Sequence, residues 1–278
     1  MTRRRKKNKS FSRLTALLVV GAAVALLVLN RDQIEGWPGI SKPVKPAPEP
    51  EKPKLVFVID DIGYHLKEEK RLNQLAGKVT YAILPLLPYS RHFGNLGKKN
   101  GSEVILHMPL ETLDGTIPGR GLIERSMSRE EILGMIGRDL DSVPHHSGSN
   151  NHMGSLGTSS PELMRIILQE IKDRGLFYLD SFTSSDSVVV PIAHELGVPV
   201  LKRDVFLDNI DAKQPIRDQI RQLKSVARKK GYAIGIGHYR TNTLEVLIQD
   251  IPQMEAEGFQ IVSLRNILDS KQKKKAAA

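Results

Sequence analysis

The sequence predicts an α/β domain in residues 54–270, a distorted (β/α) barrel of about seven or eight strands. Short apolar runs alternate with helical stretches, the runs are apolar on both faces as buried parallel strands are, and about eight such units follow one another. An open, doubly wound sheet stays an alternative, because the order of elements along a chain does not reveal whether a sheet closes.

Each element has its own signal in the sequence. The strand candidates span residues 55–59, 79–84, 103–107, 148–152, 176–179, 198–201, 233–236 and 260–263. Ser128 and Glu131 have the spacing of a capping box, and Ser160, Pro161 and Gly175 mark the start and end of another helix. No glycine-rich phosphate loop or dinucleotide motif follows the first strand, which disfavours those nucleotide-binding classes.

The positive charge lies at the two ends of the chain. The formal net charge is +10, yet seven basic residues stand in residues 1–13 and four lysines follow Ser270. Without these eleven charges the net charge is −1, so we expect no nucleic-acid partner. The chain has no cysteine, which excludes disulfides and thiol catalysis.

The first 53 residues resemble an export and anchoring segment. Residues 1–13 form a basic cytoplasmic tail, residues 14–30 are uncharged and apolar like a transmembrane signal anchor, and residues 31–53 are a proline-rich linker. We therefore expect a single-pass protein of the inner (cytoplasmic) membrane with its domain on the periplasmic side. The domain is secreted if the anchor is cleaved near its alanines. Residues 271–278 are expected to be a solvated basic tail.

Polar side chains follow almost every predicted strand. The carboxyl ends of parallel strands meet at one rim of a barrel, so these residues are expected to lie close together. They are Asp60, Asp61, His107, Glu111, Asn150, Asn151, His152, Asp180, Ser181, Arg203, Asp204 and His238. Any one of them has an ordinary structural explanation, such as a helix cap or a turn, but together they indicate a site.

The residue types in this set suit a divalent metal ion. Two imidazoles and one carboxylate from three strand ends leave coordination positions open for water and substrate, as in catalytic zinc sites. Asp60 and Asp61 stand side by side at the end of the first strand. One of them would hold the metal while its neighbour acts as a base, because a bound ion lowers the pKa of water from about 15.7 towards about 7.

Six motifs together resemble the divergent polysaccharide deacetylase family, which is related to the NodB-type carbohydrate esterases. They are IDDIG, HMPLE, NNHMGS, LDS, KRDVFLD and GIGH, each at the end of a predicted strand between residues 55 and 268. The resemblance implies a distorted (β/α) barrel and metal-dependent removal of an acyl group, usually acetate, from an N-acetylated sugar in a glycan. It also implies a divalent metal, with zinc as the expected ion.

The resemblance assigns roles by position. Asp60 matches the general base, and Asp61 and His107 match metal ligands. NodB-type enzymes have a second histidine four residues after the first, where this chain has Glu111. Either Glu111 is the third ligand or His152 completes the site from the next strand, and we prefer His152 because it keeps two imidazoles on the metal.

The remaining roles concern proton transfer and the substrate. His238 resembles the histidine acid that protonates the leaving amine, with Asp180 as the residue that orients it. Asn151, Ser181, Arg203 and Asp204 are expected to bind substrate, although surface ion pairing explains the last two equally well. The alternative is a non-catalytic domain that binds glycan or peptidoglycan, or one that regulates a cell-wall hydrolase by contact.

Overall fold

The computed structural model of the chain describes residues 51–276. The predicted cytoplasmic tail (1–13), anchor (14–30) and most of the linker (31–53) lie outside the described residues. Within residues 51–276, no helix is both long enough and apolar enough to cross a bilayer.

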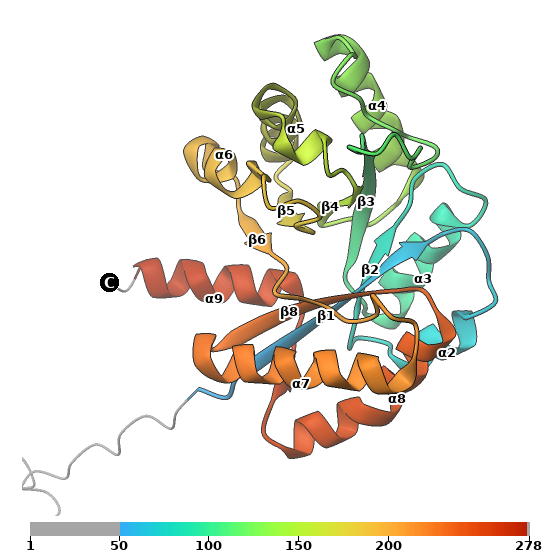
Figure 1. Cartoon of the computed structure of the whole chain (residues 1–278), viewed down its shortest axis with the longest axis vertical. Helices are drawn as coiled ribbons and strands as arrows, with labels where there is room; N and C mark the ends of the chain where they lie inside the picture. The colour runs from blue at the N-terminus through green and yellow to red at the C-terminus, as the bar shows by residue number, and fades with distance from the viewer. Residues whose placement is uncertain (1–50, 277–278) are drawn as a thin grey trace, which may run out of the picture. The chain divides into compact units, whose positions relative to one another are not determined.

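Strands and helices alternate along the described chain (Figure 1). The strands are β1 (Lys54–Ile62), β2 (Thr80–Ile83), β3 (Val104–Leu110), β4 (Gly148–Met153), β5 (Phe177–Asp180), β6 (Val200–Lys202), β7 (Val205–Phe206), β8 (Tyr232–His238) and β9 (Gln260–Ile261). The helices are α2 (Glu69–Gln74), α3 (Ser90–Asn100), α4 (Arg129–Ser142), α5 (Pro161–Asp173), α6 (Val189–Leu196), α7 (Lys213–Lys230), α8 (Thr241–Ala256) and α9 (Leu264–Ala276), with a 3₁₀ turn η2 (Gly157–Ser159). The eight strand candidates are confirmed with shifted ends, and the two-residue β7 was missed because it is too short to show a pattern.

All paired strands are parallel, in the order β6-β5-β4-β3-β2-β1-β8-β7, with β9 beside the start of β1. The two edge strands, β6 and β7, are consecutive in the chain and separated only by Arg203 and Asp204. No ladder joins them within residues 51–276. The sheet is therefore a curled half-barrel rather than a closed ring, which confirms the parallel α/β class and shows where the distortion lies.

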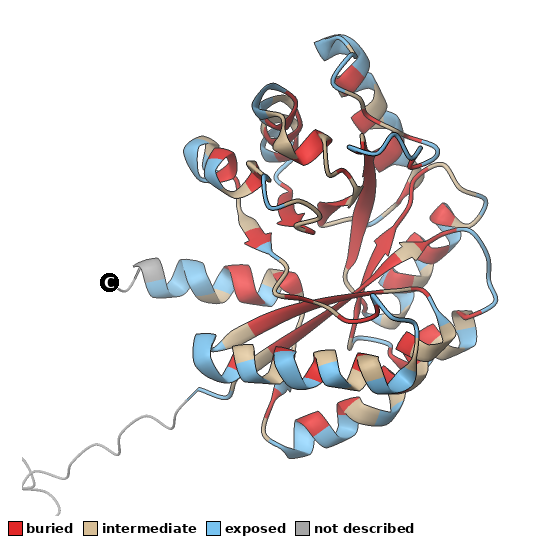
Figure 2. Cartoon of the chain, viewed as in Figure 1, coloured by how far each residue is buried: buried red, intermediate tan, exposed pale blue. Residues whose placement is uncertain are grey.

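The strands are buried along most of their length (Figure 2), and their apolar side chains belong to two clusters, an inner and an outer one. Side chains alternate between the faces along each strand. In β1, Val56 and Val58 belong to the inner cluster, whereas Phe57 and its neighbours pack in the outer cluster with the surrounding helices. Helix α9 contributes Leu264 and Ile267 to the inner cluster. The helices therefore cover the outside of the sheet, while α9 packs against its inner face.

The helix ends follow the sequence signals. The capping box of Ser128 and Glu131 starts α4, and the Ser160 side chain caps α5 with Pro161 in its first turn. The start of α9 is capped by a residue distant in the chain, because the backbone N–H groups of Leu264 and Arg265 donate to Glu103, just before β3, at 2.9 and 3.1 Å. Helix α9 continues past residue 270, the predicted end of the domain, to Ala276. The lysines after residue 270 thus extend a packed helix.

Asp139 of α4 is a buried carboxylate with no hydrogen-bond partner among the described residues. Burial raises its pKa from 3.8 to about 8, although the charge of Arg138 opposes the shift. Because the folded state holds this proton more tightly than the unfolded chain, stability falls as pH rises from about 4 to about 8.

We expect Asp139→Asn to remove this pH dependence. Between pH 6 and pH 9 the wild type should lose about 3 kcal/mol more unfolding free energy than the variant, measured by urea unfolding at each pH. Burying the amide changes the stability of the variant by an amount that is the same at every pH and cancels when two pH values are compared. Parallel pH profiles in the two proteins would contradict the assignment.

Candidate functional site

A pocket of about 260 Å³ opens at the carboxyl ends of the strands. Its lining comes from β1, β3, β4, β7 and β8 and from the loops that follow β5 and β8. The lining residues are Asp60, Asp61, His107, Asn151, His152, Met153, Ser181, Thr183, Phe206, His238 and Arg240. The predicted rim is therefore real, and it gathers most of the predicted site residues.

Both aspartates at the end of β1 line the pocket because the backbone changes conformation between them. Asp60 continues the inner row of Val56 and Val58. Asp61 would point outward in a regular strand, but its φ is +63° and the pairing of β1 with β2 shifts register between Ile59 and Ile62. A left-handed backbone conformation at a residue other than glycine destabilises the fold by on the order of 1–3 kcal/mol. Such strained residues cluster at functional sites.

Asp61, His107 and His152 form a compact cluster of donor atoms. The Oδ1 atom of Asp61 lies 3.4 Å from His107 Nε2 and 3.1 Å from His152 Nδ1, and these two nitrogens are 3.1 Å apart. The same Asp61 oxygen is buried and accepts no hydrogen bond from the described residues. Three potential ligand atoms thus converge within 3.1–3.4 Å of one another, which fits a divalent cation between them.

Asn150 fixes the ring nitrogen that His107 presents to the cluster. Its amide nitrogen donates to Asp60 Oδ1 at 3.0 Å and to Ser181 Oγ at 3.1 Å, so its Oδ1 accepts from His107 Nδ1 at 2.8 Å. The proton of neutral His107 therefore sits on Nδ1, and Nε2 keeps its lone pair for the cluster. A hydrogen bond to the far nitrogen is the usual way proteins orient a histidine ligand.

The two adjacent aspartates titrate in opposite directions. Burial raises the pKa of Asp60, and the nearby His107 and His238 only partly offset that rise. Burial also acts on Asp61, but the proximity of His107 and His152 holds its pKa well below the usual range. Asp61 is thus a permanent carboxylate, whereas Asp60 has a higher affinity for a proton.

His238 lies on the β8 side of the pocket and is held by Asp208. Its Nδ1 is 2.7 Å from Asp208 Oδ1, and its backbone N–H donates to Asp208 Oδ2 at 2.7 Å. Asp208 is fully buried and also accepts from the Thr243 hydroxyl at 2.6 Å. Burial alone would lower the pKa of His238, but the hydrogen bond and charge of Asp208 raise it to about 8.

The predicted orienting role of Asp180 is wrong. Its carboxylate accepts from the backbone N–H of Phe182 at 2.8 Å and from the Ser187 hydroxyl at 2.9 Å. The reason is strand alternation: Phe177 and Leu179 point to the inner face of β5, so Asp180 points away from the pocket. Asp208 occupies the position next to His238 instead.

The four predicted substrate-binding residues fall into three environments. Asn151 and Ser181 line the pocket and hold each other, with Ser181 N–H donating to Asn151 Oδ1 at 3.0 Å. Arg203 is not part of the pocket lining. It stacks on the lining residue Phe206, 3.6 Å from the centre of its ring. Asp204 is remote, because it pairs with Lys230 at 2.9 Å and accepts from the backbone of Ile234. The ion-pair explanation therefore holds for Asp204.

Glu111 lies apart from the cluster. Its Oε2 accepts from the side chain of Arg125 at 2.9 Å and from the Arg125 backbone at 3.2 Å. Its carbonyl oxygen accepts from Leu156 and Gly157, so the residue joins the loops on either side of it. The geometry favours His152, our preferred alternative, over Glu111 as the third donor.

Sequence reasoning missed the roles of Asn150, Asp208, Thr183 and Arg240. Asn150 was only one of many rim residues, and Asp208 follows the strand that was not recognised. Arg240 lines the pocket and donates to the carbonyl of Asp208 at 3.3 Å. A signal was available for Asp208, since it ends the KRDVFLD motif.

A curled parallel half-barrel with an Asp–His–His cluster at its carboxyl end is a polysaccharide deacetylase-like arrangement. A sequence profile of the family described as "Divergent polysaccharide deacetylase" matches residues 57–268. The chain therefore belongs to the divergent polysaccharide deacetylase family, as its motifs indicated.

The chain is also similar to two curated proteins and shares its fold with a solved structure. An uncharacterized protein of Haemophilus influenzae is 35% identical over 214 residues, covering 77% of this chain and 76% of that protein. The uncharacterized protein YibQ of Escherichia coli is 34% identical over 196 residues, covering 70% of this chain and 61% of its own length. The crystal structure of an uncharacterized Agrobacterium tumefaciens protein shares the fold, with a TM-score of 0.76 and 21% identity over 80% of this chain and 92% of that one.

We expect Asp208→Asn to lower the pKa of His238 by at least about one unit, because it removes the charge that offsets burial. A ¹H–¹⁵N NMR titration of the histidine ring measures this directly. Since the folded-state pKa exceeds the ordinary 6.5, the pair stabilises the fold fully below pH 6.5 and that contribution is lost as pH rises through about 8.

Asp204→Asn is the matched control. Asp204 also accepts a backbone N–H of β8, from Ile234 at 2.9 Å, but it does not contact His238. The His238 titration should be unchanged in that variant. An equal shift in both variants would mean that the whole strand, rather than the Asp208 carboxylate, sets the pKa.

Proposed function

We propose that the protein is a metal-dependent hydrolase that removes an acyl group, most simply acetate, from an N-acylated sugar of a cell-envelope polysaccharide. The observation that carries the proposal is one pocket lined by Asp60, His238 and the Asp61–His107–His152 cluster. Family membership supports the deacetylase chemistry. The volume of about 260 Å³ suits the acetamido end of a sugar, with the rest of a glycan lying across the rim.

Asp61, His107 and His152 would hold the divalent cation, and their nitrogen and oxygen donors suit zinc. When bound, the ion lowers the pKa of coordinated water towards about 7 and polarises the carbonyl oxygen of the amide. The surrounding residues keep the ligand atoms in the protonation state that binds a cation. Asn150 keeps His107 Nε2 unprotonated, and the low pKa of Asp61 keeps its carboxylate charged.

Asp60 is the proposed general base. Its Oδ1 is occupied by the Asn150 amide, while its Oδ2 lies 3.5 Å from His107 Nε2, beside the donor cluster. That oxygen accepts the proton from the water that attacks the amide carbon. The raised pKa of Asp60 makes it a stronger base than an ordinary aspartate.

His238 is the proposed general acid. Its Nδ1 is held by Asp208, which leaves Nε2 to donate a proton to the sugar nitrogen as the carbon–nitrogen bond breaks. With a pKa of about 8, the ring carries that proton at neutral pH. The products are the free carboxylate and the free amine of the sugar.

Two further points concern the location of the domain and its alternative function. We place the domain on the periplasmic side, held at the inner membrane by residues 14–30, because of the apolar segment and the basic residues before it. The competing function is glycan binding without turnover, or contact regulation of a cell-wall hydrolase. The separate support of His238 by Asp208 and Thr243 favours catalysis, since binding alone does not require a poised acid.

We expect the purified full-length chain, supplied with zinc, to carry about one ion per chain by elemental analysis. His152→Ala should lose that ion, because a donor of the cluster is removed. Glu111→Ala should keep it, because Glu111 contacts Arg125 instead. Loss only in Glu111→Ala would move the third ligand there, and a wild type without metal would support the binding-module function.

We expect Asp60→Asn to reduce acetate release from N-acetylated peptidoglycan at least about 10²-fold, the usual contribution of a general base. Its zinc content should stay near the wild-type value, since Asp60 is not in the donor cluster. Asp204→Asn, which makes the same change at a remote ion pair, should retain activity. Full turnover in Asp60→Asn would remove the base assignment.

A further inference from the structure

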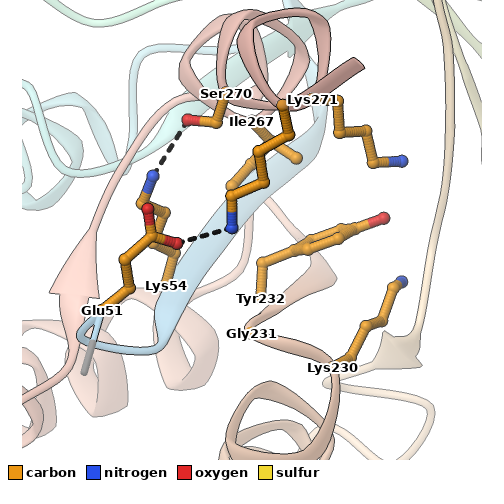
Figure 3. Close-up of a pocket in the computed structure, with 9 residues that line it drawn as sticks. Glu51, Lys54, Lys230, Gly231, Tyr232, Ile267, Ser270 and Lys271 are labelled. Carbon is orange, nitrogen blue, oxygen red and sulfur yellow. Dashed lines mark hydrogen bonds and ion pairs between the residues drawn. The ribbon is translucent and has the colours of Figure 1, made fainter. Parts of the chain in front are cut away.

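A second pocket lies at the opposite end of the sheet, where β1 and β8 begin (Figure 3). Lys54 and Tyr232 are paired residues at the starts of these strands. Helix α9 passes over them, and the cavity enclosed is about 170 Å³. The polar side chains that line it are Glu51, Lys54, Lys230, Tyr232, Ser270, Lys271 and Lys274. None of them belongs to the catalytic pocket.

The lining of this amino-end pocket is strongly basic. Four lysines and one carboxylate, Glu51, line the pocket. Lys274 contacts Glu51 at 2.7 Å, and Lys230 contacts Asp204, which lies outside the lining, at 2.9 Å. Lys54 donates to the uncharged Ser270 hydroxyl at 2.9 Å. Lys271 has no carboxylate within ion-pair distance among residues 51–276. The positive charge of the pocket is therefore only partly neutralised by the described chain.

Two of these ammonium groups contact the same aromatic ring from opposite sides (Figure 3). Lys230 Nζ lies 4.1 Å and Lys271 Nζ 5.0 Å from the centre of the Tyr232 ring. Cation–π attraction stabilises each contact by only about 0.5–1 kcal/mol at exposed sites, and the two like charges repel each other. An anion bound in the cavity would be attracted by both ammonium groups, most strongly by Lys271, which has no carboxylate partner among residues 51–276.

We propose that the amino-end pocket binds a phosphoryl group. Separate lysines converge on the cavity from β1, α7 and α9, which suits an anion with oxygens in several directions better than a planar carboxylate. Lysine binds phosphate as a point charge, and the cavity has room for a phosphate ester or pyrophosphate. The phosphoryl group belongs either to a soluble phosphorylated molecule or to an anionic lipid headgroup.

The test is amine-selective acylation of the full-length chain, with labelling of each lysine followed by mass spectrometry. Inorganic phosphate and pyrophosphate are compared with chloride at equal ionic strength. Vesicles of phosphatidylcholine are compared with vesicles that also contain phosphatidylglycerol. We expect at least about fivefold slower labelling of Lys230 and Lys271, with no change at Lys98, an exposed lysine of α3.

Paired variants show whether the pocket is responsible. Lys271→Gln with Lys274→Gln should raise the concentration that half-protects Lys230 about 25-fold, as each basic side chain near an anion contributes about a factor of five. Lys98→Gln with Lys99→Gln removes the same charge from another exposed helix surface and should have no effect.

Each outcome decides the proposal. Protection by free phosphate or pyrophosphate supports it and identifies a soluble ligand. Protection only with phosphatidylglycerol vesicles supports it and identifies a lipid headgroup. Equal protection of Lys98, equal effects of the two double variants, or no protection in any arm would overturn it.

Discussion

The alternation of side chains along parallel strands controls what reaches the pocket. On the inner face of the curled sheet, β1 and β8 are apolar until their last residues, with Val56 and Val58 in β1 and Ile234 and Ile236 in β8. The next residue in each of these two inner rows is Asp60 or His238. The ionisable groups thus lie directly beside the apolar inner cluster, at the carboxyl end of the strands, where burial shifts their pKa values.

Asp61 departs from this alternation, and the departure gives the two adjacent aspartates different environments. A regular strand would offer one carboxylate to the pocket and direct the other outward. The left-handed backbone of Asp61 turns it toward His107 and His152, while Asp60 remains in the inner row beside Asn150. Two carboxylates separated by one peptide bond therefore have opposite pKa shifts, and one local strain of the backbone accounts for both environments.

Sequence alone could predict the fold class, the strands and the donor cluster, because these depend on short apolar runs and on the residues that follow them. It could not predict the gap between β6 and β7, since closure depends on ladders between residues distant in the chain. Asp180 illustrates a different limit. Its place at a strand end suggested the pocket, but counting alternation from Phe177 would have directed it outward and left the role to Asp208. The left-handed Asp61 has no sequence signal of its own.

The two ends of the sheet are chemically independent but geometrically linked. From Lys54 to Asp60, β1 rises about 20 Å, at roughly 3.3 Å per residue, through the apolar inner cluster. A charge bound at the amino end therefore acts weakly on the titration of the pocket, because it lies beyond the Debye length of about 8 Å at physiological ionic strength. Orientation, in contrast, is transmitted by a rigid sheet. If the amino-end pocket binds a lipid headgroup through Lys230 and Lys271, the Asp61–His107–His152 cluster faces away from the lipid surface. The cluster is then accessible to a glycan.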